Sequence, residues 1–381
     1  MKFSLSLLCE NPTRKTGLTT LYAALIEKSL LLYPELSWIL YVGEAMEIEF
    51  PPEVASRVQI VRDYAGNDRV YPRLFADHFL VAPHAAKNGS LCHVTTGFIP
   101  MRKAGLPIAM HMLTLHHLSE DNQVDPLRKF YRSMAARKGL ENADLIITNT
   151  EFVVSQILQI CPSAKDRMIQ SYEGLDHADF NDQPEEGEVE RLAESYGITP
   201  GYLFWSSNFY PYKQAELLMD AYADLPDELQ ETMPLIMVGG GGWGNGLDEA
   251  LERAKSNSIP EHRVKHLGWV PDEDIPALFR HAHLFSLPSR EETFGRCVLE
   301  SMACGTPCVV NDIPVMHEVT QGAAKIVDYR DRKATTEALY SLATDEALRT
   351  QMIEAGLKRS KDFDFDILAK ERVEAIQQML G

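Results

Sequence analysis

The sequence predicts an α/β protein made of two doubly wound domains, each a parallel sheet covered by helices on both faces. Three observations support this fold class. The chain of 381 residues is longer than one ordinary hydrophobic core supports. Short apolar runs typical of buried strands alternate with helical segments throughout. The alternation restarts after a polar, acidic stretch at 181–188, NDQPEEGE, whose Pro and Gly favour a linker.

The first domain is expected to span residues 1–185. Its strands are predicted where apolar residues run for a few positions, at 4–8, 38–42, 58–61, 91–95, 108–115 and 145–148. Its helices are predicted between them, at 19–32, 72–87, 127–140 and 152–160. Pro126 suits the first turn of the third helix, with Asp125 before it as an N-cap.

The second domain is expected to span residues 186–364, and the terminal helix, 365–381, is expected to pack back on the first domain. The strands of the second domain are predicted at 202–205, 235–238, 264–267, 284–287 and 308–311, with helices between them. Open α/β sheets bind ligands at the carboxyl ends of their strands. If two such domains face each other, the deep cleft between them is the natural site.

Composition excludes several classes of function. The formal charge of −18 disfavours a nucleic-acid partner, because phosphate backbones would be repelled. We expect no secretory signal, since the first apolar run is short, and no apolar stretch reaches the roughly 18 residues that span a membrane. The six cysteines form no zinc pattern. Reduced thiols in a cytoplasmic protein are therefore expected.

The most informative segment is 289–319, SREETFGRCVLESMACGTPCVVNDIPVMHEV, which follows the predicted strand 284–287. It predicts a loop, a helix beginning after Gly295, and another strand. The start of a helix carries N–H groups without partners in the helix and about half a positive charge. The amides of Phe294, Gly295 and Arg296 would therefore suit a pyrophosphate, and glycine leaves room for its approach.

This segment resembles the signature of the retaining glycosyltransferases with the GT-B fold, in which two Rossmann-like domains face each other. The family includes bacterial lipopolysaccharide and mannosyl transferases. The family pattern matches ETFG at 292–295 and ESMACGTP at 300–307, with Thr293 where the family usually has Gly. The resemblance implies that Glu292 approaches hydroxyls of the transferred sugar and stabilises the reacting centre. It implies that Glu300 holds the ribose hydroxyls. The alternative is that both acids are ordinary surface residues at the start of a helix.

The start of the second domain, 202–213, resembles the family segment in which an Arg and a Lys neutralise the diphosphate. Lys213 matches the Lys, but Ser207 and Asn208 stand where the Arg is expected. Asn208 could donate neutral hydrogen bonds instead, and Arg296 could supply the second charge. The alternative for Lys213 is a solvated loop residue.

Other positions carry weaker parts of the resemblance. His116 matches a family His that contacts the donor sugar, with His117 where the family has Asp, although a packed or exposed bystander is the alternative. Gly17 lies in a turn where the family has glycines close to phosphate. Val270 lies in a turn beside the nucleotide base. The GxGxxG pattern at 239–244 is interpreted as a loop at the rim of the donor pocket rather than a dinucleotide motif.

No catalytic metal and no cofactor are expected. The acidic residues in DFDFD at 362–366 resemble the DxD pair of another glycosyltransferase fold, but they lie far in sequence from the donor segments, so capping and surface charge are the better interpretation. The basic helix 127–140 has Phe130 and Met134 on an apolar side. Such helices can dock on anionic lipid, and a solvated amphipathic helix is the alternative.

The sequence thus predicts a retaining, metal-independent hexosyltransferase. The resemblance implies a UDP- or GDP-sugar donor and a saccharide or lipid-linked acceptor hydroxyl, in assembly of bacterial surface polysaccharide or lipopolysaccharide, in the cytoplasm or at the inner face of the membrane. Two alternatives stay open at this point: a nucleotide-sugar epimerase of similar fold, and a non-catalytic nucleotide-sugar binder.

Overall fold

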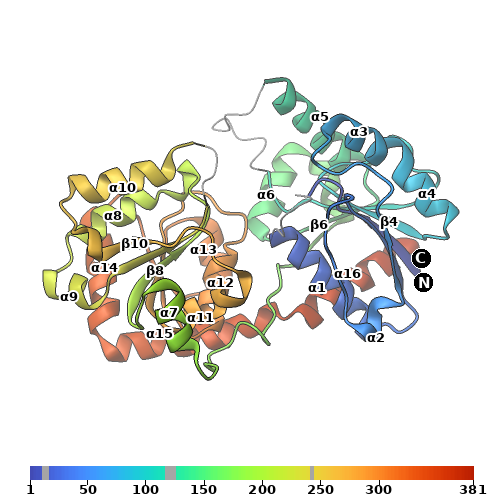
Figure 1. Cartoon of the computed structure of the whole chain (residues 1–381). Coiled ribbons are helices and arrows are strands. Elements are labelled where there is room, and N and C mark those ends of the chain that lie inside the picture. Colours follow the sequence, from blue (N-terminus) through green and yellow to red (C-terminus); the bar gives the residue numbers. More distant parts are fainter. Residues whose placement is uncertain (11–16, 116–125, 241–243) are drawn as a thin grey trace. The chain divides into compact units, whose positions relative to one another are not determined.

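The computed structural model describes residues 1–10, 17–115, 126–240 and 244–381, and it divides into two compact units (Figure 1). Unit 1 comprises Met1–Gly174 and Phe365–Gly381, and unit 2 comprises Leu175–Asp364. Each unit is a parallel sheet with helices, so the predicted fold class is confirmed.

The sheet of unit 1 has seven parallel strands in the order β3-β2-β1-β4-β5-β6-β7. The strands are β1 (Lys2–Ser6), β2 (Ser37–Tyr41), β3 (Val58–Val61), β4 (Cys92–Thr96), β5 (Ile108–His111), β6 (Leu145–Thr148) and β7 (Met168–Gln170). The apolar runs predicted six of them. The seventh, β7, is three half-buried residues long and was not predicted.

Helices cover both faces of this sheet. Neighbouring residues of one strand, which point to opposite faces, pack into different apolar clusters. Ala109 packs with α1 and the terminal helix, whereas Met110 packs with α5 and α6. The helices are α1 (Gly17–Leu32), α2 (Pro52–Ala55), α3 (Val70–Phe75), the π-helix η1 (Ala76–Leu80), α4 (Val81–Lys87), α5 (Pro126–Asn142), α6 (Glu151–Ile160), the 3-10 turn η3 (Pro162–Arg167) and α16 (Phe365–Leu380). Asp125, predicted to cap α5, lies outside the described residues.

The sheet of unit 2 has six parallel strands in the order β10-β9-β8-β11-β12-β13. The strands are β8 (Tyr202–Ser206), β9 (Leu235–Val238), β10 (Val264–His266), β11 (Ala282–Leu287), β12 (Cys308–Asn311) and β13 (Lys325–Val327). Five were predicted. The short edge strand β13 was missed. Strands β8 and β11 are neighbours in this sheet, so the loops that follow them meet at its carboxyl edge.

The helices of unit 2 alternate with these strands along the chain. They are α7 (Glu188–Tyr196), α8 (Ala215–Ala223), α9 (Asp227–Thr232), α10 (Gly246–Ser256), α11 (Ile275–Arg280), α12 (Arg296–Ala303), α13 (Pro314–Thr320), α14 (Arg332–Thr344) and α15 (Glu346–Ser360). Single 3-10 turns occur at η4 (Pro211–Lys213), η5 (Glu261–Arg263), η6 (Asp272–Asp274) and η7 (Lys361–Phe363).

The chain passes from unit 1 to unit 2 at residues 174–175, earlier than the expected boundary at 185. The acidic stretch that follows is held on unit 2, because the Arg280 guanidinium donates to the carbonyl oxygens of Asp179 and Asn181 and pairs with the buried Glu188 at 2.5 Å. Composition alone indicated a linker there. The return to unit 1 occurs at Phe365, and a Cβ on Gly174 would collide with the Phe365 ring.

Candidate functional site

The loop between β11 and α12 ends in a left-handed residue that starts the helix. Gly295 has φ 86° and ψ 50°, a left-handed backbone conformation that residues other than glycine rarely adopt. Its carbonyl accepts from the Val298 amide at 2.9 Å, which begins α12. The Phe294 side chain is buried and packs edge-on against Phe363 with 5.6 Å between ring centroids. The ring therefore anchors the loop, and only the backbone of residue 294 can serve a ligand.

Two side chains that the sequence analysis singled out separately form one ion pair. The Lys213 ammonium donates to Glu292 Oε1 at 2.6 Å, although the residues are far apart in the chain. They meet because Lys213 follows β8 and Glu292 follows the neighbouring strand β11. Their side chains are 12% and 11% exposed, so the pair is shielded but still reachable from solvent. Burial lowers the pKa of Lys213, but Glu292 more than offsets this effect, and the pKa is raised.

Backbone and aromatic contacts hold the same two loops together. The Arg290 amide donates to the Tyr212 carbonyl at 2.9 Å. The rings of Tyr210 and Tyr212 stack at 5.4 Å, and the Lys213 ammonium lies 5.3 Å from the centre of the Tyr212 ring. The Lys213–Glu292 pair is therefore held by contacts on both sides rather than by its charges alone.

A second ion pair lies on α12 itself. Arg296 Nε donates to Glu300 Oε1 at 3.0 Å, one helical turn apart, and the two side chains are 21% and 14% exposed. Both were predicted to bind the donor. The structure therefore places a cation in the first turn and a carboxylate in the second turn of the helix that Gly295 begins.

Two more loops, after β9 and β10, meet the β8 loop at the carboxyl edge of this sheet. The Gly239 amide donates to the Gly268 carbonyl at 2.8 Å, and a Cβ on Gly239 would collide with the Ser207 carbonyl. This close approach explains one glycine of the GxGxxG pattern, whose middle glycine lies outside the described residues. Asn208 is exposed beside these contacts, as a donor to a ligand must be. Val270 is buried, so it can offer only its backbone.

The sequence analysis missed residues that support the β11 loop. Asn311, at the end of β12, donates to the Ser289 carbonyl at 3.1 Å and accepts from the Tyr329 amide at 3.1 Å. Cys297 lies in the first turn of α12, and burial raises the pKa of its thiol, with Glu292 adding to the shift. The polar residue that ends the apolar run of β12 was the only sequence signal for Asn311.

In unit 1, Gly17 begins α1 and is exposed. His116, the predicted contact to the donor sugar, lies outside the described residues, as does His117. Among the residues that the structure describes, no three His, Cys, Asp or Glu side chains form a group able to hold a metal ion. In the DFDFD segment, Asp362 pairs with Arg359 at 2.8 Å, as expected of a surface carboxylate.

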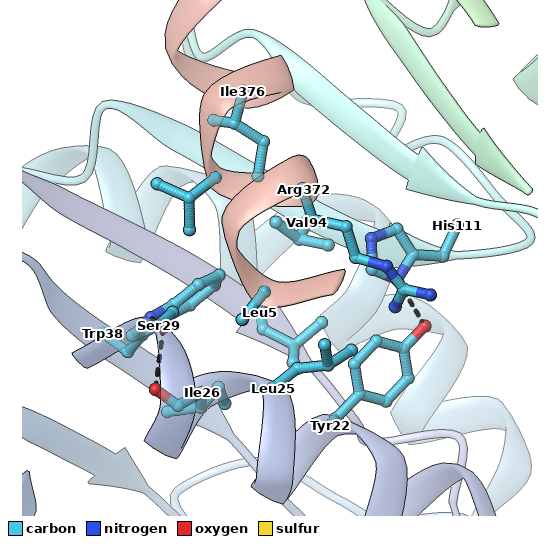
Figure 2. Close-up of a pocket in the computed structure, with 12 residues that line it drawn as sticks. Leu5, Tyr22, Leu25, Ile26, Ser29, Trp38, Val94, His111, Arg372 and Ile376 are labelled. Carbon is cyan, nitrogen blue, oxygen red and sulfur yellow. Dashed lines mark hydrogen bonds between the residues drawn. The ribbon is translucent and has the colours of Figure 1, made fainter. Parts of the chain in front are cut away.

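Unit 1 also contains a small internal cavity (Figure 2). Its volume is about 30 Å³, which is room for little more than one or two water molecules and far too small for a nucleotide sugar. It is lined by α1, α16 and strand residues, namely Leu5, Tyr22, Leu25, Ile26, Ser29, Trp38, Val94, His111, Ala369, Arg372, Val373 and Ile376. The buried Arg372 guanidinium donates to the carbonyls of Ser171 and Tyr172. The cavity is therefore a packing feature beneath the terminal helix.

The described helices include none that is long and apolar enough to cross a membrane.

The two parallel-sheet α/β units have the domain architecture of the GT-B fold. Solved structures agree over nearly the whole length. A sucrose-phosphate synthase from Thermosynechococcus elongatus superimposes with a TM-score of 0.80 at 18% identity, covering 99% of this chain and 98% of that one. WaaG, a glycosyltransferase involved in lipopolysaccharide biosynthesis, gives a TM-score of 0.74 at 15% identity over 98% of both chains. At these identities the likeness establishes the fold alone.

One family model matches part of the sequence. Residues 188–359, less than half of the chain, match the model of the glycosyl transferases group 1 family.

Two relatives align over most of the chain. One is O-antigen chain mannosyltransferase B of Escherichia coli, 27% identical over 284 residues, which are 74% of this chain and 73% of the relative. The other is a D-inositol 3-phosphate glycosyltransferase of Corynebacterium urealyticum, 24% identical over 305 residues, which are 79% of this chain and 71% of that protein. A third relative, the serotype-specific mannosyltransferase WbdA of Escherichia coli, is 26% identical over 67% of this chain, and the aligned part is 31% of its own length.

Proposed function

We propose that this glycosyltransferase is a retaining enzyme that moves a hexose from a UDP- or GDP-sugar to a hydroxyl of a saccharide or lipid-linked acceptor. We further propose that it works in the cytoplasm, at the inner face of the membrane, in assembly of a bacterial surface polysaccharide or lipopolysaccharide. The O-antigen mannosyltransferase among its relatives supports the choice of hexose and pathway class.

The observation that carries the proposal is the Lys213–Glu292 pair beside the left-handed start of α12. A diphosphate is attracted to a helix N-terminus, and a nearby ammonium adds charge-assisted hydrogen bonds. When the donor binds, Lys213 can exchange Glu292 for a phosphate oxygen. The carboxylate of Glu292 is then released to accept hydrogen bonds from the sugar hydroxyls. Breaking this one ion pair would therefore prepare Lys213 to bind phosphate and Glu292 to bind the sugar.

The second pair would divide between the donor's ribose and phosphate in the same way. Glu300 suits the two ribose hydroxyls, and Arg296 suits the phosphates. Asn208 and the backbone around Val270 complete the proposed donor site in unit 2. The resemblance also assigns Gly17 to the phosphate and His116 to the transferred sugar, and both assignments stay predictions. The cations Lys213 and Arg296 would neutralise the leaving group, so we propose a metal-independent reaction that needs no cofactor.

The proposed chemistry uses no protein nucleophile. The bond between the anomeric carbon and the diphosphate oxygen breaks, and the acceptor oxygen bonds to the same carbon from the same face. The acceptor proton passes to the departing diphosphate oxygen, and the products are a glycoside and a nucleoside diphosphate. Glu292 stabilises the positive charge that develops on the sugar, and Lys213 stabilises the negative charge on the leaving group.

The test is a donor screen with UDP-, GDP-, dTDP- and ADP-sugars, each incubated with and without mannosyl or glucosyl acceptors in the presence of EDTA. Release of nucleoside diphosphate together with a new glycoside, whose anomeric configuration by NMR equals that of the donor, is the expected result. Inversion, or a requirement for added metal, overturns the corresponding part of the proposal. Conversion of a donor without an acceptor would identify an epimerase, and binding with neither transfer nor donor hydrolysis would identify a sugar-nucleotide binder.

A further inference from the structure

Unit 1 exposes a stripe of aromatic side chains along the continuous helical segment α3–η1. Tyr71 is 85% exposed, Phe75 57%, Phe79 37% and the adjoining Leu80 39%. Tyr71, Phe75 and Phe79 are four residues apart, and the rings of Phe75 and Phe79 contact one another at 5.3 Å between centroids. Single exposed apolar residues are ordinary, but a contiguous exposed aromatic stripe indicates an interaction surface.

Two neighbouring elements widen this stripe. The Arg102 amide donates to the carbonyl of His78, which brings the loop carrying Met101, 61% exposed, onto η1. His78 Nε2 and the Tyr131 hydroxyl are hydrogen-bonded at 2.6 Å, which brings α5 and its Phe130, 67% exposed, to the same helix. Figure 1 shows α3 and α5 in the same part of unit 1. We name the six side chains Tyr71, Phe75, Phe79, Leu80, Met101 and Phe130 the aromatic face.

The border of the aromatic face is cationic on the side of α5 and Met101, although the whole chain carries a formal charge of −18. Beside the start of α3 the exposed acids Glu44 and Asp68 are paired with Arg69. On α5, the exposed Arg137 and Lys138 lie about two helical turns beyond Phe130, and the first acid after them is the exposed Glu141. The exposed Arg102 lies beside Met101. Another bordering cation, Lys103, has a carboxylate partner, Asp144, at 3.6 Å. The acid on η1, Asp77, is buried and pairs with Arg73, so it adds little charge to the surface.

We propose that the aromatic face docks on an anionic lipid surface. Aromatic side chains are suited to the boundary between headgroups and acyl chains. The surrounding Arg and Lys side chains can reach anionic headgroups while their stems cover apolar surface. This charge complementarity favours a lipid surface over an apolar protein groove, which would leave the cations without counter-charge. The proposal deepens the membrane location proposed above, on which it rests, but it does not depend on the transfer reaction.

The test is co-flotation of the full chain with vesicles. Binding is expected to vesicles that contain phosphatidylglycerol, with little binding to pure phosphatidylcholine, and it should weaken as salt is raised. The double variant Phe75→Ser/Phe79→Ser should lower the vesicle affinity at least tenfold, and Arg137→Glu/Lys138→Glu should lower binding to the anionic vesicles only. The matched control is Tyr340→Ser, which removes a 46% exposed aromatic ring from α14 of unit 2 and should leave binding unchanged.

Three results would overturn the proposal. The first is equal binding to neutral and anionic vesicles, and the second is unchanged binding by the Phe75/Phe79 variant. The third is a lipid-free dimer, seen by analytical ultracentrifugation, that the same variant dissociates, because the face would then join two copies of this chain. Thermal unfolding checks that the variants fold. Turnover with a soluble acceptor should be unchanged, so failure of the docking proposal is distinguishable from failure of the proposed reaction.

Discussion

At the carboxyl edges of both sheets, loops that follow neighbouring strands contact one another, but the side chains that make these contacts differ. In unit 2 the strand-end loops meet through full charges, Lys213 with Glu292 and Arg296 with Glu300, and all four side chains keep some exposure. In unit 1 the contacts at the described strand ends are more deeply buried, and the carboxylate of the Arg73–Asp77 ion pair is only 2% exposed. Ser6 donates to Asp77 at 2.7 Å, and Tyr22 and His111 are joined at 2.7 Å.

The fold brings the loops together in both units, whereas the residues on those loops decide whether a ligand can reach them. Both sheets bring loops together, but only the unit 2 pairs are accessible enough for a charged ligand to exchange with them. Burial lowers the pKa of His111 well below its usual value, so this imidazole is neutral and serves packing. The charged side chains of unit 2 are therefore open to exchange with the proposed diphosphate, whereas the described strand ends of unit 1 are packed against other side chains.

The largest effect is expected for Glu292→Gln, which tests whether the accessible carboxylate of unit 2 acts in the reaction. The substitution preserves the shape of the side chain and its hydrogen bond with Lys213 but removes the charge that is proposed to stabilise the transition state. We expect turnover to fall by about 10²-fold, the usual effect of losing one such contact. The measurement is kcat with a saturating donor, alongside thermal unfolding. Glu291→Gln, the same change at the preceding residue, should leave kcat within a few-fold of wild type.

Lys213→Met separates the two roles of the pair. If Lys213 binds the diphosphate, this variant should bind nucleoside diphosphate more weakly, whereas Glu292→Gln should bind it about as well as wild type. Equal losses of binding in both variants would mean that the pair only supports the loops. Near wild-type turnover of Glu292→Gln would remove Glu292 from the mechanism.

Sequence alone predicted the fold class and eleven of the strands, because buried parallel strands are apolar runs that need no knowledge of their neighbours. It could not predict β7 and β13, which are short and only partly buried. It named Lys213 and Glu292 but not their pairing, since that depends on β8 lying beside β11. It offered helix 127–140 with Phe130 as a possible lipid-docking element, but it could not join that helix to the α3–η1 stripe and Met101, which come from separate segments.

Substitutions at glycine sharpen the role assigned to the start of α12. Gly295 and Gly322 have nearly the same backbone, φ 86° and φ 88°, but different surroundings. A Cβ at Gly322 would meet open space, whereas one at Gly295 would lie 2.5 Å from Met316 Cε. Gly322→Ala should cost about 1 kcal/mol of unfolding free energy for its left-handed backbone, and Gly295→Ala about 2 kcal/mol because Met316 must also move.

Urea unfolding measures these costs, and donor KM measures the functional consequence. Only Gly295→Ala should raise donor KM, because only that substitution disturbs the loop next to the proposed diphosphate. A similar rise in donor KM for Gly322→Ala would show that general destabilisation, rather than the helix start, controls donor binding.

The smallest expected effect tests the buried acid of unit 1. Burial raises the pKa of Asp77 from 3.8 to about 6, against the lowering effects of the Ser6 hydroxyl and Arg73. The folded state therefore binds a proton that the unfolded state has released between about pH 4 and 6. Stability from this group is greatest at low pH and is lost as the pH rises through 6.

Asp77→Asn removes this titration, so the variant should gain about 1 kcal/mol relative to wild type between pH 5 and pH 7. Urea unfolding at both pH values measures the difference, and Asp63→Asn, at an exposed position of unit 1, controls for the loss of one negative charge. Parallel profiles for Asp77→Asn and wild type would mean that the Asp77 carboxylate is stabilised in its charged form. Asp77 would then be a carboxylate paired with Arg73 from pH 5 upward, and the strand ends of unit 1 would differ from those of unit 2 only in burial.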